Sequence, residues 1–274
     1  METAEASGTA IQSEEDPPPY GQHANKSEHH HQESRSQKPP GPFESVSPCP
    51  DPPSRQFPTS WSLYHQPLTR VLMLGSHEDK PIHAVSHHTG WYGQPDMILH
   101  NGPSESLPML AATQRSSTFG EKKYCIIILP PLPGSALDSS QEILRLNYHW
   151  PIVTFRFTIE IGATPEKWTR ESFEWRHSYR MVASILDGVG DGWKLVRLST
   201  ADRGKTQKRR PEAASDGGEI VAAWGYARRS LTKAMKFSFL GSGASGVLGD
   251  RWALTTVMTA LRMYQGQERH WDWL

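Results

Sequence analysis

The sequence predicts a mainly β fold: a closed antiparallel barrel of about eleven strands around a hydrophobic C-terminal helix. Two observations lead to this prediction. About eleven short runs of strand-type residues lie between turn signals, and one helical segment near the C-terminus is apolar around most of its circumference. An open sheet of that size tends to curl or close, and closure removes exposed edges. A helix inside would be covered on every side, whereas a helix on one face of a two-layer stack would stay partly wet.

Composition and charge narrow the class of protein. The chain has 274 residues and a formal net charge of zero, but residues 1–57 hold nine acidic and four basic side chains, so the rest is mildly basic. That bias falls well short of a nucleic-acid-binding domain. Two cysteines exclude a disulfide scaffold, no apolar run reaches the roughly 18 residues of a membrane span, and no signal-peptide pattern is present. We expect an intracellular protein, cytoplasmic and either membrane-peripheral or nuclear.

The chain divides into two regions. Residues 1–57 are rich in Pro, Ser, Glu, Gln and His and predict a disordered tail. The tract His29–His31 is a weak metal-binding candidate, although we favour a solvated tail. Residues 58–274 predict the barrel domain, with strands near 61–66, 70–75, 81–87, 96–101, 108–114, 123–129, 151–161, 172–177, 192–199, 218–227 and 234–240.

Alternation of apolar and polar residues is clearest in two of these strands. In residues 153–161, Val, Phe and Ile share one face while Thr, Arg and Glu share the other, and residues 234–240 alternate in the same way. Two loop insertions interrupt the pattern. Residues 130–148 begin with two prolines and end in a predicted short helix at 141–146, and residues 200–217 have almost no apolar side chains and predict a mobile loop.

The helix is expected from Asp250 to Tyr264, where the apolar spacing follows a period near 3.6. Asp250 would cap its N-terminus and Gly266 would end it. One narrow polar stripe runs along it, formed by Arg251, Thr255, Thr259 and Arg262. We expect the arginines near the two barrel mouths and the threonines hydrogen-bonded to helix carbonyls. The helix residues expected in the core are Trp252, Leu254, Val257, Met258, Leu261 and Tyr264.

Four short segments carry a family resemblance: Lys80–Val85 (KPIHAV), Pro95–Pro103 (PDMILHNGP), Glu171–Arg176 (ESFEWR) and Gly218–Trp224 (GEIVAAW). In this order, across residues 61–266, they resemble a fungal member of the Tubby C-terminal-like domain superfamily. That superfamily includes the tubby proteins, the plant LURP-one-related proteins and the phospholipid scramblases. The resemblance implies a twelve-stranded barrel around a central C-terminal helix, which adds a twelfth strand to the roughly eleven predicted from the residues. No residues here match the phosphoinositide-binding residues of tubby proteins, so that activity is not carried over.

A glycine-rich motif precedes the helix. Residues 241–246 read GSGASG, the G-x-G-x-x-G spacing of a dinucleotide-binding turn, and follow a predicted strand. That fold also needs a second parallel strand after the helix and an acidic residue at a strand end about 20 residues further on, and neither is found. We therefore interpret the motif as a flexible link from the barrel wall into its interior.

Five histidines lie close together in the sequence: His77, His83, His87, His88 and His100. His83 and His87 would share a strand face, but no cysteine and few carboxylates accompany them. We therefore expect neither a metal nor another cofactor, and we interpret these histidines as polar residues around a barrel rim.

Two basic groups are candidate sites for anionic ligands. One follows a strand and comprises Arg228, Arg229, Lys233 and Lys236; the other lies in the polar loop and comprises Lys205, Lys208, Arg209 and Arg210. Clustered Lys and Arg attract anionic lipid headgroups by about 1 kcal/mol each near a membrane. The loop group also has the composition of a nuclear import signal. A solvated charged surface is the alternative for both groups.

No catalytic motif is recognisable in the sequence. It lacks G-x-S-x-G, H-E-x-x-H and paired catalytic carboxylates, and Cys125 lies in an apolar run typical of inert core cysteines. We expect a non-enzymatic binding domain for a phospholipid, phosphoinositides included, or for a protein partner. Two alternatives stay open: a barrel that holds a small apolar ligand or acts as an unrecognised enzyme, and a nuclear scaffold or adaptor.

Overall fold

The computed structural model describes residues 56–89, 94–115, 124–149, 152–187, 189–198, 218–228 and 230–268. The strands are β1 (Ser60–His65), β2 (Leu72–His77), β3 (Lys80–His87), β4 (Met97–His100), β5 (Met109–Arg115), β6 (Tyr124–Leu129), β7 (Ser140–His149), β8 (Ile152–Ile161), β9 (Thr169–Ser178), β10 (Gly192–Arg197), β11 (Ile220–Tyr226) and β12 (Lys233–Phe239). The helices are α1 (Arg180–Ile185), α2 (Gly241–Ser245) and α3 (Asp250–Glu268), with a 3₁₀ turn at Pro165–Lys167. Most of the predicted tail and all of the predicted 200–217 loop lie outside the described residues.

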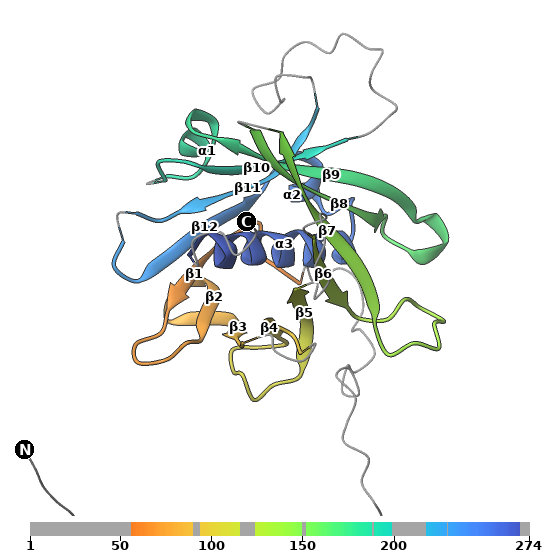
Figure 1. Cartoon of the computed structure of the whole chain (residues 1–274), viewed down its shortest axis with the longest axis horizontal. Coiled ribbons are helices and arrows are strands. Elements are labelled where there is room, and N and C mark those ends of the chain that lie inside the picture. Colours follow the sequence, from red (N-terminus) through yellow and green to blue (C-terminus); the bar gives the residue numbers. More distant parts are fainter. Residues whose placement is uncertain are drawn as a thin grey trace, which may run out of the picture. The chain divides into compact units, whose positions relative to one another are not determined.

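The predicted closed barrel is confirmed. Every strand pairs antiparallel with its neighbours in sequence, and β1 also pairs with β12, so the sheet has no free edge. Figure 1 shows α3 running through the middle of the ring of strands. Among the described helices, none is long and apolar enough to cross a membrane.

The twelfth strand is β7, which replaces the short helix predicted at 141–146. Its first half, Ser140–Arg145, pairs with β6, and its second half, Arg145–His149, pairs with β8. The prediction was wrong because β7 places a carboxylate, Glu142, among its buried positions and an aliphatic residue, Ile143, on its exposed side. This exchange hides the two-residue period from which a strand is recognised.

The barrel interior is filled by the apolar faces of the strands. In β8, Phe155, Phe157 and Ile159 are buried while Arg156 is exposed, which confirms the predicted alternation. The core also includes Phe57, which lies in the region predicted as tail and packs 5.2 Å from the His83 ring. The barrel domain therefore begins slightly earlier than residue 58.

Helix α3 is buried on nearly all sides. The six side chains predicted for its core are each at most 4% exposed, which confirms that prediction: Trp252, Leu254, Val257, Met258, Leu261 and Tyr264. Its ends differ from the prediction. Asp250 is its first residue and not its cap, and the helix continues through Gly266 to Glu268. A buried glycine inside the barrel stays helical because the surrounding strands fix the backbone.

The polar stripe of α3 lies as predicted. Thr255 donates a hydrogen bond to the Arg251 carbonyl and Thr259 donates one to the Thr256 carbonyl, both at 2.9 Å. Arg251 binds groups at the ends of β6 and β8, whereas Arg262 contacts Asp96 at the start of β4. Those strand ends lie at opposite ends of the barrel.

We name the two ends after the helix. The N-terminal mouth, where α3 begins, carries the β2–β3, β4–β5, β6–β7 and β8–β9 connections. The C-terminal mouth, where α3 ends, carries the β1–β2, β3–β4, β7–β8, β9–β10 and β11–β12 connections.

Helix α1 was not predicted. It lies in the β9–β10 connection and covers the outside of the barrel, where Val182 packs with Leu186, Val189 and Ala223. Gly225 on β11 allows this close approach, because a Cβ at that position would clash with Val189.

Candidate functional site at the C-terminal mouth

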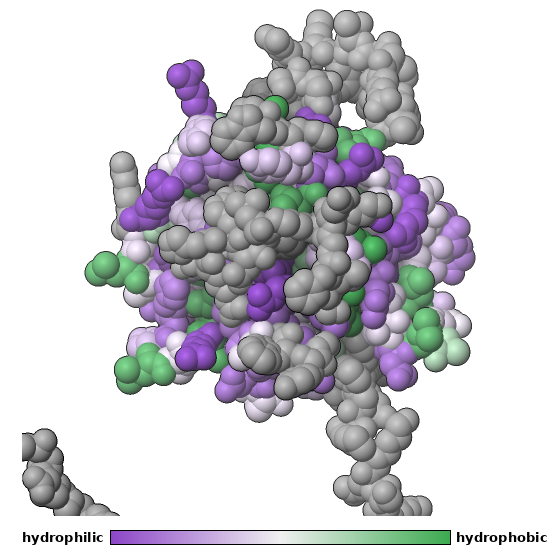
Figure 2. Space-filling view, viewed as in Figure 1, coloured by the Kyte–Doolittle hydropathy of each residue, from purple (hydrophilic) through white to green (hydrophobic). Residues whose placement is uncertain are grey.

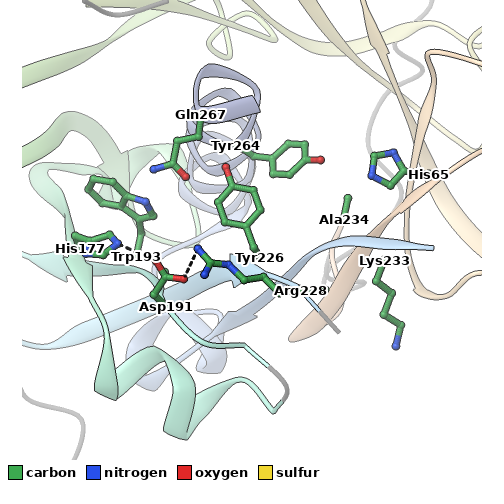
Figure 3. A pocket seen from close by; sticks show the side chains of 12 residues that line it. His65, His177, Asp191, Trp193, Tyr226, Arg228, Lys233, Ala234, Tyr264 and Gln267 are labelled. Carbon is green, nitrogen blue, oxygen red and sulfur yellow. Dashed lines mark ion pairs between the residues drawn. The ribbon is translucent and has the colours of Figure 1, made fainter. Parts of the chain in front are cut away.

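A pocket of about 540 Å³ opens at the C-terminal mouth (Figure 3). The ends of five strands and the last turns of α3 meet there. The lining residues are His65, His177, Asp191, Gly192, Trp193, Tyr226, Ala227, Arg228, Lys233, Ala234, Tyr264 and Gln267. The pocket thus combines residues that are up to about 200 positions apart in the sequence.

Asp191 organises the charged side of this pocket. Its two carboxylate oxygens lie 3.1 Å from Nη2 of Arg228 and 3.5 Å from Nε2 of His177 (Figure 3). The contact with Arg228 is an ion pair without hydrogen-bond alignment, since Asp191 Oδ1 has no hydrogen-bond partner. The Arg228 side chain is also 66% exposed, so it is free to turn toward a ligand.

Aromatic rings form the rigid part of the wall. Trp193 and Tyr264 are buried, and the Tyr226 and Tyr264 rings lie 5.6 Å apart. His177 packs edge-on against Trp193 with ring centroids 5.2 Å apart. Lys233 lies 5.8 Å from the centroid of the Tyr64 ring, a cation–π distance. Cations on preorganised aromatic surfaces suit a ligand with an anionic group and an apolar or ring-shaped body.

A buried ionic cluster lies near the same mouth. Asp96 is fully buried, accepts a 2.7 Å hydrogen bond from Thr113, and lies 3.4 Å from Arg115 and 3.7 Å from Arg262. Gln265 joins it by donating to the Asp96 carbonyl and accepting from Arg262. This cluster ties the last turns of α3 to β4 and β5, and so holds the pocket floor in place.

The structure divides the predicted basic group. Arg228 and Lys233 line one pocket, but Lys236 lies on the other face of β12 and donates to the Asp187 carbonyl. Arg229 and the second group, Lys205, Lys208, Arg209 and Arg210, lie outside the described residues. Sequence reasoning missed His65, His177 and Asp191 as pocket residues, because they come together only where strand ends meet at one mouth.

The prediction for the histidine group holds only in part, since His77 and His88 are exposed at strand ends. His83 and His100 are buried and not on an exposed rim: His83 Nδ1 bonds the His100 carbonyl at 2.9 Å, and Ser86 Oγ bonds His100 Nε2 at 2.8 Å. Burial lowers the pKa of His83, against the opposing effect of its backbone hydrogen bonds. The described residues contain no group of three metal-ligating side chains.

The glycine-rich motif forms the short helix α2 and not a flexible link. Glu219 accepts hydrogen bonds from the backbone N–H and hydroxyl of Ser242 at 2.7 and 2.9 Å. A Cβ on Gly243 would clash with the Val221 carbonyl and lie 2.6 Å from the Trp252 ring. A carboxylate therefore occupies the position that a phosphate would need, and the glycine serves close packing.

Two further predictions concern the barrel interior. Cys125 is buried on β6, where burial raises the pKa of its thiol to about 11, so it is an inert core residue as predicted. The buried circumference of α3 fills the space in which a small apolar ligand would have to bind.

No protein-family model matches this chain, and neither curated proteins nor solved structures match it.

Proposed function

We propose that this chain is a non-enzymatic binding domain whose C-terminal mouth binds the phosphorylated headgroup of an anionic phospholipid. The pocket itself carries the proposal, because Arg228 and Lys233 line it from adjacent parts of the β11–β12 hairpin. Its volume of about 540 Å³ is that of a small-ligand site. Arginine and lysine are the side chains that bind phosphate oxygens most strongly.

The balance of charge supports an anion. Asp191 is the one carboxylate among the twelve lining residues, against Arg228 and Lys233. The C-terminus of α3 adds a partial negative charge beside Gln267. A phosphate would therefore bind on the β11–β12 side of the pocket, and the remainder of the headgroup would contact the aromatic wall.

The family resemblance is consistent with this proposal. A twelve-stranded barrel around a C-terminal helix is the architecture that the resemblance implies, so we propose membership of the Tubby C-terminal-like superfamily. The headgroup site rests on the pocket and not on this membership.

A soluble headgroup tests the proposal without a membrane. Calorimetric titration of the full chain with inositol trisphosphate should show saturable binding. The double variant Arg228→Ala/Lys233→Ala should bind at least about tenfold more weakly, because each charge-assisted hydrogen bond contributes about 1.5–3 kcal/mol.

Two single variants provide matched controls. Lys236→Ala removes a charge from the same strand but outside the pocket, and Lys167→Ala removes one at the opposite mouth. Both should bind inositol trisphosphate like the wild type. Absence of wild-type binding, or an equal loss in the Lys236→Ala variant, would refute the pocket assignment.

A further inference from the structure

Two leucines at the C-terminal mouth are fully exposed. Leu68 lies in the β1–β2 connection and Leu231 in the β11–β12 connection, and no other large hydrophobic side chain of the described residues is as exposed. Figure 2 shows hydrophobic side chains protruding over these two loops, on the left of the view. Exposed apolar side chains grouped at one site mark an interaction surface.

The backbone holds Leu68 outward against its own preference. The turn from Gln66 to Thr69 is closed by the Thr69 N–H to the Gln66 carbonyl, and Pro67 occupies its second position. Leu68 occupies the third position with φ 63°, where glycine is normally required. A branched residue in the left-handed region is disfavoured, and such strain is concentrated at functional sites.

The two loops are joined at their bases. The His65 N–H donates to the Thr232 carbonyl at 2.9 Å, next to Leu231. Ser230 fixes the second loop, because its hydroxyl accepts the Lys233 N–H at 3.0 Å. Both leucines therefore lie on one side of the mouth, in loops that are hydrogen-bonded to each other at their bases.

The surroundings of the leucines are cationic. Arg70 is exposed in the same loop as Leu68, and Arg228 and Lys233 flank Leu231. Further around the mouth, Ile152 is also largely exposed at the base of the β7–β8 connection. Single apolar tips separated by basic residues match a lipid surface, which needs no shape complementarity, better than a protein partner, which needs a contiguous packed patch.

We propose that the C-terminal mouth docks end-on against an anionic membrane, with Leu68 and Leu231 inserted among the lipids beside the bound headgroup. This inference rests on the proposed headgroup site, which supplies the specific anchor. The leucines add an apolar anchor, and the exposed basic side chains attract the negatively charged surface.

Vesicle co-sedimentation of the full chain tests the proposal. The vesicles contain phosphatidylcholine with or without phosphatidylinositol bisphosphate. Leu68→Ser/Leu231→Ser should bind inositol trisphosphate like the wild type. The same variant should bind the bisphosphate vesicles at least about tenfold more weakly, since each leucine loses its burial in lipid. Leu137→Ser is the control, because Leu137 is 70% exposed at the opposite mouth, and its vesicle binding should be unchanged.

The outcomes separate the two proposals. If the wild type binds the vesicles and the double leucine variant binds them equally well, insertion is refuted while the headgroup site stands. If wild-type protein binds neither inositol trisphosphate nor the vesicles, the headgroup site itself is wrong. Equal losses in the Leu137→Ser control would also refute insertion, because the effect would not be specific to this mouth.

A fluorescent label gives an independent readout. Leu68→Cys, in a chain that also carries Cys49→Ser, can be labelled with a polarity-sensitive dye, since the remaining thiol, Cys125, is buried. The emission should shift to the blue on addition of bisphosphate vesicles. Label at Leu137→Cys should not shift, and an unshifted spectrum at position 68 with vesicles bound would overturn the proposed orientation.

Discussion

The two mouths of the barrel differ in how they are closed. At the N-terminal mouth, Arg251 donates to Glu160 and to Ser140, and Arg170 bridges Glu160 and Glu142. At the C-terminal mouth, the corresponding helix arginine, Arg262, is buried below the mouth beside Asp96. A pocket remains open above the strand ends. The first mouth is sealed by its ion pairs, whereas the second keeps its ionic cluster inside and leaves room for a ligand.

The exposed charges differ in sign between the mouths. In the described connections, the exposed charged residues at the N-terminal mouth are Glu78, Asp79, Glu105, Asp138, Glu166 and Lys167, and those at the C-terminal mouth are Arg70, Arg180, Asp187 and Arg228. The first set is acidic and the second basic. Within the described connections, the C-terminal mouth is therefore the end better suited to an anionic surface.

The largest expected effect comes from the two helix arginines. Arg262→Ala should lower the free energy of unfolding by about 3–5 kcal/mol, because it removes the buried cation beside Asp96 and leaves that carboxylate only Thr113 and the partly exposed Arg115. Arg251→Ala should cost about 1.5–3 kcal/mol, since water can reach the carboxylates that remain. Urea denaturation at neutral pH measures both values. An equal loss in the free energy of unfolding for the two variants would contradict the proposal that one helix arginine is buried and the other is accessible to water.

The second prediction concerns the seal at the N-terminal mouth. Gly249→Ala should cost about 2–4 kcal/mol, because φ is 85° and the new Cβ would clash with the Gly162 carbonyl. Gly134→Ala, at the same mouth with φ 76° but nothing within 4 Å, should cost only about 1 kcal/mol. Denaturation curves for the two variants separate the cost of the steric clash, which only Gly249→Ala has, from the cost of a positive φ, which both have. A similar loss of stability in both variants would show that the backbone around Gly162 shifts to accommodate the new Cβ at position 249.

The third prediction is a pH dependence at the N-terminal mouth. Burial alone would raise the pKa of Glu160, but the hydrogen bond from Arg251, a backbone hydrogen bond and the charges of Arg170 and Arg251 together lower it below its usual 4.5. The folded-state pKa is depressed, so this stabilisation is present above pH 4.5 and is lost as pH falls through the folded pKa. Unfolding measured between neutral and acidic pH should show a shallower decline in Arg251→Ala than in the wild type. An unchanged slope would show that Arg251 does not set this pKa.

The smallest effect has the opposite sign and lies at the C-terminal mouth. Leu68→Gly should raise the free energy of unfolding by about 0.5–1 kcal/mol, because glycine accepts φ 63° without strain. The same change should weaken vesicle binding. Thermal denaturation with co-sedimentation tests both effects, and lower stability in this variant would mean that the turn is not strained.

The fold was predictable because its signals are local. Alternation in β8 and the helical period of residues 250–264 are each visible within about ten residues, and both are confirmed. The strand β7 was not predicted because one of its buried positions is occupied by Glu142, which forms an ion pair with Arg170 and is not an apolar core residue. Helix α1 was missed because it is only six residues long, which is less than two turns and too short to show a helical period.

The candidate site was predictable only in part. The cluster that follows β11 contains Arg228 and Lys233, which the structure places in one pocket, but also Lys236, which points elsewhere. Lys233 and Lys236 are three positions apart on β12, so alternation places them on opposite faces, but the sequence does not show that Lys233 reaches the mouth where Arg228 lies.

The sequence by itself determined that a helix apolar on most sides had to be enclosed and that many strands had to close, since both follow from local periodicity and the cost of wet apolar surface. Only the tertiary structure decided that the two ends of this barrel would differ. His65, Asp191 and Tyr264 come from distant parts of the chain and meet because antiparallel pairing brings alternate connections to the same mouth. The exposed Leu68 and Leu231 also come together only there, because the pairing of β1 with β12 places their two loops side by side.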